Sequence, residues 1–241
     1  MRYGALINAA AIVLGALIGM LGGHLLKDNV KETMFKGVGV CVIMIGLGGM
    51  LSKMLVRSGD GFSTQGSVMI ICTMAAGGMT GELLQLEKLL DRFGAWLREK
   101  TGNSRDGGFI DAFVTTTLVV GIGAMAVVGS VTDGLTGDFS ILLVKSLLDL
   151  LFVMILASRM GKGCAFAFVP VLIFEGGLTL LAGVLSPMVT EQTMACLSQV
   201  GNIMIFMIGV NIIWPDTFRA GNYLPALVFA VAWAFLGLPM T

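Results

Sequence analysis

Charged side chains are scarce in this chain: Asp, Glu, Lys and Arg make up 12% of its 241 residues, whereas 56% are hydrophobic. A soluble domain needs a far more polar surface, so the composition excludes that class and is typical of an all-α polytopic membrane protein. Acidic and basic residues number 15 each. Without a basic excess, no nucleic-acid partner is expected.

Histidine and clustered cysteine are lacking too. His24, expected in a loop, is the only histidine, and four single cysteines stand far apart at positions 41, 72, 164 and 196. This pattern excludes the usual metal-ligand spacings and histidine-dependent nucleophiles. The segment GLTGD at 134–138 is one residue longer than the GxGD motif of intramembrane aspartyl proteases. We therefore expect no enzyme, no metal site and no cofactor, and cysteines that act as small core hydrophobes.

Long hydrophobic runs are what the chain does have. One transmembrane helix needs about 20 apolar residues, which leaves room for about eight spans in a single integral membrane domain over residues 1–241. Seven spans are possible if the short third run does not cross. The predicted spans are residues 4–26, 34–56, 66–81, 109–130, 140–158, 163–185, 199–214 and 222–239.

Lys and Arg are unevenly distributed between the two sides of this arrangement. Eleven of the 15 fall in alternate loops, whereas Arg2, Lys53 and Arg57 fall on the opposite side. Because cytoplasmic loops are enriched in Lys and Arg, both termini are expected outside if eight helices cross. The C-terminus changes sides if only seven do.

The one long polar segment predicts an amphipathic surface helix over residues 82–100. Apolar residues recur at spacings of three and four from Leu83 to Leu97, and charged residues fill the other faces. Trp96 suits the headgroup layer of the lipid bilayer. The alternative is a cytoplasmic extension of the third span.

The chain resembles itself at an offset of 160 residues. Residues 21–50 share ten identical positions with residues 181–210 without gaps. This similarity indicates repeats formed by spans 1–3 and 6–8, which flank a central helix pair. An odd number of spans separates matched elements, so the two copies have opposite directions in the membrane. Inverted three-helix repeats are typical of secondary transporters, whose solute site lies near the midplane.

Closely spaced glycines predict close helix contacts. Glycines four residues apart line one helix face and allow two backbones to approach each other. These helix-packing glycines are Gly15, Gly19 and Gly23 in the first span, and Gly77 and Gly81 at the end of the third.

Ionisable residues inside spans are candidates for binding a solute or ion, because an unpaired charge in hydrocarbon is costly. Glu175 lies in the sixth span between Pro170 and two glycines, where an interrupted helix is expected. Lys145 and Asp149 are one turn apart on the fifth span and can pair. The full candidate set adds Asp111 and Thr115 in the fourth span and the amides of Asn8, Asn202 and Asn211.

These candidates have structural alternatives. Lys145 and Asp149 can form a permanent pair, Asp111 can be solvated near the headgroups, and the amides can simply tie helices together. In the segment TDGLTGD, Asp133 and Asp138 could attract cations on the outer side, but a tight solvated turn is the expected structure.

Six motifs carry a wider resemblance. They are GALINAAAIVLGALIG, VVGIGAMAVVGSVTDGLTGD, KSLLDLLFVMILAS, FVPVLIFEGGLTLLAG, IGVNIIW and NYLPAL. With them the chain resembles the YqgA-like family of uncharacterised bacterial inner-membrane proteins, domain of unknown function 554, over nearly its whole length. The resemblance implies the bacterial cytoplasmic membrane and supplies no substrate or site residues. At Glu175 the family is expected to carry Gln more often, so an acid there need not be essential to a shared activity.

The resulting hypothesis is a small secondary transporter or channel-like protein that moves a small solute or ion. Three acids against one Lys favour a cation, a proton-coupled step or an amine-bearing solute. The alternative is a non-transporting membrane scaffold or partner-binding subunit that docks a partner on the helix at 82–100. A homodimer is compatible with a glycine-rich bundle.

Overall fold

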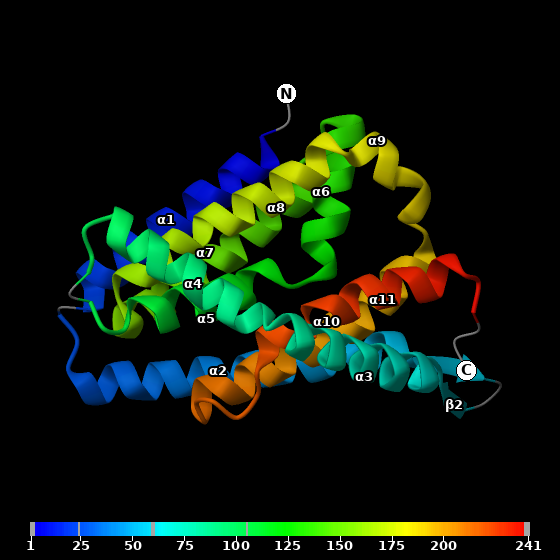
Figure 1. The fold of residues 1–241 in the computed structure, drawn as a ribbon, viewed down its shortest axis with the longest axis horizontal. Coiled ribbons are helices and arrows are strands. Elements are labelled where there is room, and N and C mark those ends of the chain that lie inside the picture. Colours follow the sequence, from blue (N-terminus) through cyan, green and yellow to red (C-terminus); the bar gives the residue numbers. More distant parts are fainter. Residues whose placement is uncertain (1–2, 24, 59–60, 105, 239–241) are drawn as a thin grey trace. The chain divides into compact units, whose positions relative to one another are not determined.

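The computed structural model describes residues 3–23, 25–58, 61–104 and 106–238 (Figure 1). His24 and its expected loop lie outside the described residues. The elements are α1 (Gly4–Gly23), α2 (Asp28–Met54), β1 (Leu55–Ser58), β2 (Gly61–Thr64), α3 (Ser67–Leu84), α4 (Leu86–Lys100), α5 (Phe109–Gly121), α6 (Ala124–Thr136), α7 (Ser140–Met160), η1 (Lys162–Ala167), α8 (Phe168–Leu180), α9 (Ala182–Leu185), η2 (Ser186–Met188), α10 (Glu191–Ile213), η3 (Ala220–Tyr223) and α11 (Leu224–Phe235). The two strands form an antiparallel hairpin that pairs Leu55 with Thr64.

Six helical segments are long and apolar enough to cross a membrane: α1, α2, α3, α7, the continuous segment formed by η1 and α8, and α10. The predicted fourth span is a broken pair, α5 and α6, bent by 64° after Gly121. The predicted last span is short, since its apolar helix covers only Ala220–Phe235. The described residues thus hold six spans, or seven with the broken pair, rather than eight. The chain is an all-α polytopic membrane protein, and the third predicted run is among the six.

Two helices differ from their predicted form for local reasons. The seventh predicted span begins earlier, at Glu191, because the Thr190 hydroxyl accepts the Thr193 amide at 3.1 Å and caps α10. The interruption expected near Glu175 is not there, since α8 is continuous through it. Pro170 lies in the first turn of α8, where proline removes no intrahelical hydrogen bond.

The chain forms two compact units. Unit 1 comprises residues 1–38 and 88–186, and unit 2 comprises residues 39–87 and 187–241. In unit 1, α1 packs along α7 and α8, and α5 and α6 complete the bundle (Figure 1). In unit 2, α3 and α10 pack against α11 around Met69, Cys196, Val200 and three alanines of α11.

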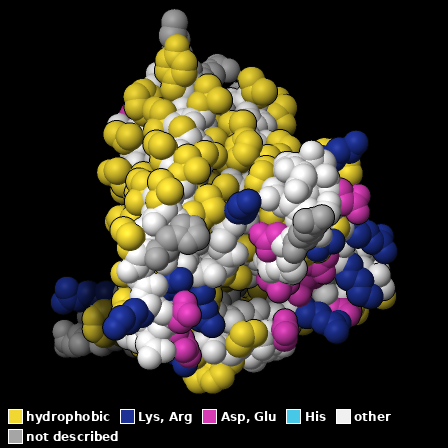
Figure 2. Space-filling model, turned by 90° about the vertical axis from the view of Figure 1, so that its left-hand side faces the viewer, with side chains coloured by type: hydrophobic (Ala, Val, Ile, Leu, Met, Phe, Trp, Pro, Cys, Tyr) yellow, Lys and Arg dark blue, Asp and Glu magenta, His cyan; other side chains and the backbone are white. Residues whose placement is uncertain are grey.

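Large apolar side chains cover much of the surface. Leu14 and Leu17 on α1 and Leu147 on α7 are examples, at 52%, 45% and 61% exposed. Figure 2 shows a face on which hydrophobic side chains form a broad area and charged side chains gather outside it. Such an area indicates contact with lipid. Cys41 and Cys72 are exposed, which corrects their expected core role, whereas the other two cysteines are buried.

The helix α4 is a separate amphipathic helix that follows α3 directly. Gln85 has a left-handed backbone (φ 52°), which ends α3 and excludes a straight extension of the third span. Leu97 packs on Phe109 and Phe113 in the core of unit 1. The helix predicted over residues 82–100 is therefore shorter at its start and held on one side by α5. Its place at the membrane surface stays a prediction.

Asp91 on α4 gives a pH-dependent prediction. Partial burial, and then the nearby Asp111 carboxylate, raise the pKa of Asp91 above its ordinary value. Ionisation of Asp91 therefore disfavours the folded state. Asp91→Asn should raise the melting temperature at neutral pH and lose this advantage as the pH falls through the raised pKa towards the ordinary one. Thermal unfolding of both proteins across that pH range checks this, and a pH-independent difference would contradict it.

Candidate functional site

Three glycines bring α1 close to α7. A Cβ atom at any of them would collide with the carbonyl oxygen of a residue on α7. The contacts are Gly15 with Leu150, Gly19 with Met154 and Gly23 with Ser158. Because the contacts advance by four residues along both helices, α1 and α7 run in the same direction. This close contact fixes how the polar residues of α1 and α7 meet inside unit 1.

A buried cluster of charged and amide side chains lies among α1, α7 and α8. Asn8 and Glu175 are fully buried, and Lys145 and Asp149 are only 6% and 5% exposed. The Asn8 side-chain amide donates to both oxygens of the Glu175 carboxylate, at 2.9 and 3.1 Å. We call these four residues the charge cluster.

Lys145 connects the charge cluster to the break between α5 and α6. Its ammonium donates to Asp149, one turn further along α7, and lies 3.3 Å from Glu175 Oε1. It also donates to the carbonyl oxygen of Val120 at 2.6 Å. The backbone is extended at Ile122 (φ −90°, ψ 122°), so α5 ends there. The last carbonyls of a helix have no intrahelical partner, and the break thereby presents the Val120 oxygen to the ammonium.

The charge cluster is electrostatically unbalanced. Two carboxylates face one ammonium, so the fully ionised cluster carries one excess negative charge among described groups. Uncompensated charge in a low-dielectric interior is unfavourable, and protonation or a bound cation relieves it. The arrangement is therefore chemically able to take up and release a proton or a small cation.

Four of the eight candidate residues lie elsewhere. Asp111 is exposed and Thr115 is half-buried on α5, and neither takes part in the bonds described for the charge cluster. In unit 2, the Asn202 amide donates to the Ser198 carbonyl at 2.7 Å. Asn211 bonds both the amide and the carbonyl of Phe218 and so holds the turn after α10. The two amides of unit 2 thus make local structural bonds.

Sequence reasoning missed the Val120 carbonyl and Asp133. Asp133 was expected in a solvated turn but is fully buried in α6, where it accepts the Gly4 amide at 3.0 Å. Only Asp138 lies in the turn, and hydrogen bonds from the Ser140 hydroxyl and amide hold the pKa of Asp138 below its ordinary value. Ser130 lies three residues before Asp133 and so on the same face of a helix, and this spacing is the sequence feature that could have indicated a polar helix face here.

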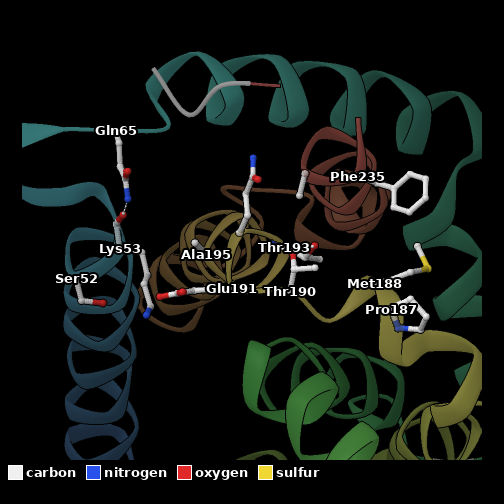
Figure 3. A pocket seen from close by; sticks show the side chains of 12 residues that line it. Ser52, Lys53, Gln65, Pro187, Met188, Thr190, Glu191, Thr193, Ala195 and Phe235 are labelled. Atoms are coloured by element: carbon white, nitrogen blue, oxygen red, sulfur yellow. Dashed lines mark hydrogen bonds between the residues drawn. The ribbon is translucent and has the colours of Figure 1, made fainter. Parts of the chain in front are cut away.

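Unit 2 contains a separate hollow of about 780 Å³ where α2 passes into the hairpin. Lys53 and Glu191 point toward one another beside it, and the Gln65 amide donates to the Lys53 carbonyl at 3.1 Å (Figure 3). Phe235 comes from α11 on another side of the hollow. None of the candidate residues predicted from the sequence lines it.

Comparison with known proteins places this chain in a family. A family model for proteins of unknown function, DUF554, matches residues 3–235. The chain belongs to the DUF554 family. It is 28% identical over 235 residues to the uncharacterized protein YqgA of Escherichia coli (strain K12), covering 96% of this chain and 95% of that one. It is 25% identical over 230 residues to the uncharacterized membrane protein YdfK of Bacillus subtilis (strain 168), covering 94% and 93%.

DUF554 membership confirms the resemblance carried by the six sequence motifs. The description of YdfK as a membrane protein agrees with the apolar helices of this chain. No solved structure matches the chain significantly. Because the family description names no activity, a function must be argued from the site itself.

Proposed function

We propose that this DUF554 protein is a small secondary transporter or channel-like protein of the bacterial cytoplasmic membrane. It moves a small solute or ion, performs no covalent chemistry, and uses the charge cluster as its site. The observation that carries the proposal is the unbalanced pair of buried carboxylates around Lys145 at a helix break. Ionisable residues inside membrane spans and interrupted helices are recurrent features of ion and solute pathways.

The way the helices pair supports an inverted repeat. Spans 1–3 correspond to α1, α2 and α3, and spans 6–8 correspond to α8, α10 and α11. In unit 2, Gly77 contacts Ala226 and Gly81 contacts Asn222, so α3 runs antiparallel to the chain at η3 and α11. Each unit packs matched helices together, α1 with α8 in unit 1 and α3 with α11 in unit 2.

A matched glycine pair adds to this support. Gly49 and Gly209 are equivalent at the offset of 160 residues. Gly49 lies against Asn202 of α10, and Gly209 lies against Ile43 of α2. At this offset, Asn202 corresponds to position 42, which is adjacent to Ile43. The two glycines therefore contact almost equivalent positions in the opposite repeat, as a pseudo-two-fold axis requires. The charge cluster combines one helix of each repeat with the central helices.

The test is a thermal-stability screen of the purified protein in detergent with ions, amino acids and small organic acids. A ligand at about 100 times its Kd stabilises the folded state by about 2.7 kcal/mol. We expect one class of solute to raise the wild-type midpoint and to have no effect on Glu175→Gln or Asp149→Asn. Glu32→Gln, which changes an exposed carboxylate, should respond like the wild type.

Uptake into reconstituted vesicles completes the test. Glu175→Gln should abolish or alter uptake of that solute while the amount of folded protein stays unchanged. Uptake that equals the wild type would remove Glu175 from the mechanism.

A second candidate function is a non-transporting scaffold or partner-binding subunit. The observation that favours it is the closed form of the charge cluster, whose three charged side chains are at most 7% exposed and bonded to one another. In that case α4, on which Trp96 is 51% exposed, would dock the partner. This candidate would be favoured if no solute in the screen raised the melting temperature of the wild type and if Glu175→Gln were as stable as the wild type.

A further inference from the structure

Six buried side-chain polar atoms in unit 1 lack a hydrogen-bond partner among the described residues. Three of the six lie on α1 and α6 and belong to fully buried residues: Asn8 Oδ1, Ser130 Oγ and Asp133 Oδ1. Buried polar atoms nearly always bond to protein or to water, and a free carboxylate oxygen is especially unfavourable. Three such atoms in one region indicate water molecules as their partners.

The helix α1 places two of these atoms one turn apart. The Gly4 amide donates to Asp133 Oδ2, and the Asn8 amide donates to Glu175. Gly4 and Asn8 are four residues apart on one face of α1, a rise of about 6 Å. Asp133 therefore lies about one helical turn from the charge cluster, toward the end of unit 1 where α1 begins.

The contact between α6 and α8 brings in the third atom. Gly134 lies against the backbone of Thr179, and both helices run toward the same end of unit 1 (Figure 1). Ser130 precedes Gly134 by one turn, and Glu175 precedes Thr179 by one turn. Helical periodicity thus places Ser130 on the face of α6 that α8 covers, at the level of Glu175.

We propose that Asp133, Ser130 and Asn8 line a hydrated path that delivers protons to Glu175. The path rests on the proposed function, because it makes the proton the ion taken up by the charge cluster. A proton passes from water to the Asp133 carboxylate, and through bound water to Glu175, which becomes neutral and later releases the proton. Lys145 and Asp149 face Glu175 from α7, and the Gly4 amide faces Asp133 from α1.

Silver-ion accessibility tests hydration without requiring transport. In full-length protein with its four native cysteines replaced, Ser130→Cys and Val131→Cys are exposed to Ag⁺, and unreacted thiols are counted by maleimide labelling after denaturation. Val131 is the matched control, because it is adjacent on α6 and 3% exposed. Desolvation that raises a thiol pKa by about one unit removes about nine-tenths of its thiolate at neutral pH. Ser130→Cys should therefore react about tenfold faster or more, and equal rates would overturn the path.

Proton flux into vesicles containing a pH-sensitive dye tests the role of Asp133. Asp133→Asn keeps an acceptor for the Gly4 amide and should slow flux about tenfold or more, whereas the exposed Asp138→Asn should not. If the wild type moves protons and Asp133→Asn moves them equally fast, the proposed path is wrong while the proposed function stands. If the wild type moves neither protons nor any solute, the proposed function is wrong. The comparison of silver-ion reactivity then still decides whether the path is hydrated.

Discussion

Lys145→Met should destabilise the folded protein by about 3–5 kcal/mol, the usual loss when one partner of a buried ion pair is removed. Methionine has a similar length but leaves Asp149 and Glu175 buried without a counter-ion. It also leaves the Val120 carbonyl without a donor. Thermal unfolding and protease resistance of the purified protein measure the loss.

A matched control separates burial from charge. Lys36→Met removes the same side chain from a pair with Glu32 at 2.7 Å, in which both side chains are more than half exposed. Surface pairs of this kind contribute little, so Lys36→Met should behave like the wild type. Adding Asp149→Asn and Glu175→Gln to Lys145→Met should restore part of the stability, because no charged side chain then remains in the charge cluster. Equal, small effects of the two Lys substitutions would contradict the buried charge cluster.

Gly19→Leu should prevent α1 from packing on α7. A side chain at Gly19 would collide with the backbone of Met154, which cannot rotate away as a side chain can. Overpacking usually destabilises by about 1–3 kcal/mol, and a collision with backbone belongs at or above the upper end of that range. The amount of folded protein extracted from membranes, and its melting temperature, measure the effect.

Gly22 provides the comparison on the same helix. Nothing lies within 4 Å of a Cβ atom at Gly22. Gly22→Leu therefore adds the same side chain without a collision, and we expect it to fold and melt like the wild type. If both leucine variants were equally defective, the contact between α1 and α7 would not be the cause.

The features predictable from the sequence were those set by local pattern. Apolar run length located six of the eight predicted spans, since a helix must be about 20 residues long to cross a bilayer. Lys145 and Asp149 were paired correctly because residues four apart always share a helix face. The family was likewise evident from local motifs.

Features that depend on tertiary partners could not be predicted. Gly176 and Gly177 stay helical in α8, whereas the chain breaks at Ile122, where Lys145 bonds the freed Val120 carbonyl. Asp133 lies in a segment that resembles a turn and is buried because the start of α1 contacts it. Both contacts join residues that are far apart in the sequence, so a local pattern can indicate a polar helix face but not the residue that contacts it.

The interleaving of the two units has a consequence for synthesis on the ribosome. Unit 1 is complete once residue 186 has been made, whereas unit 2 waits for residues 187–241. The glycine faces of α2 and α3 that later receive α10 and α11 therefore enter the bilayer long before these helices exist. Unit 1 can close first, and during that interval unit 2 is the part of the nascent chain on which insertion factors and quality-control proteases can act.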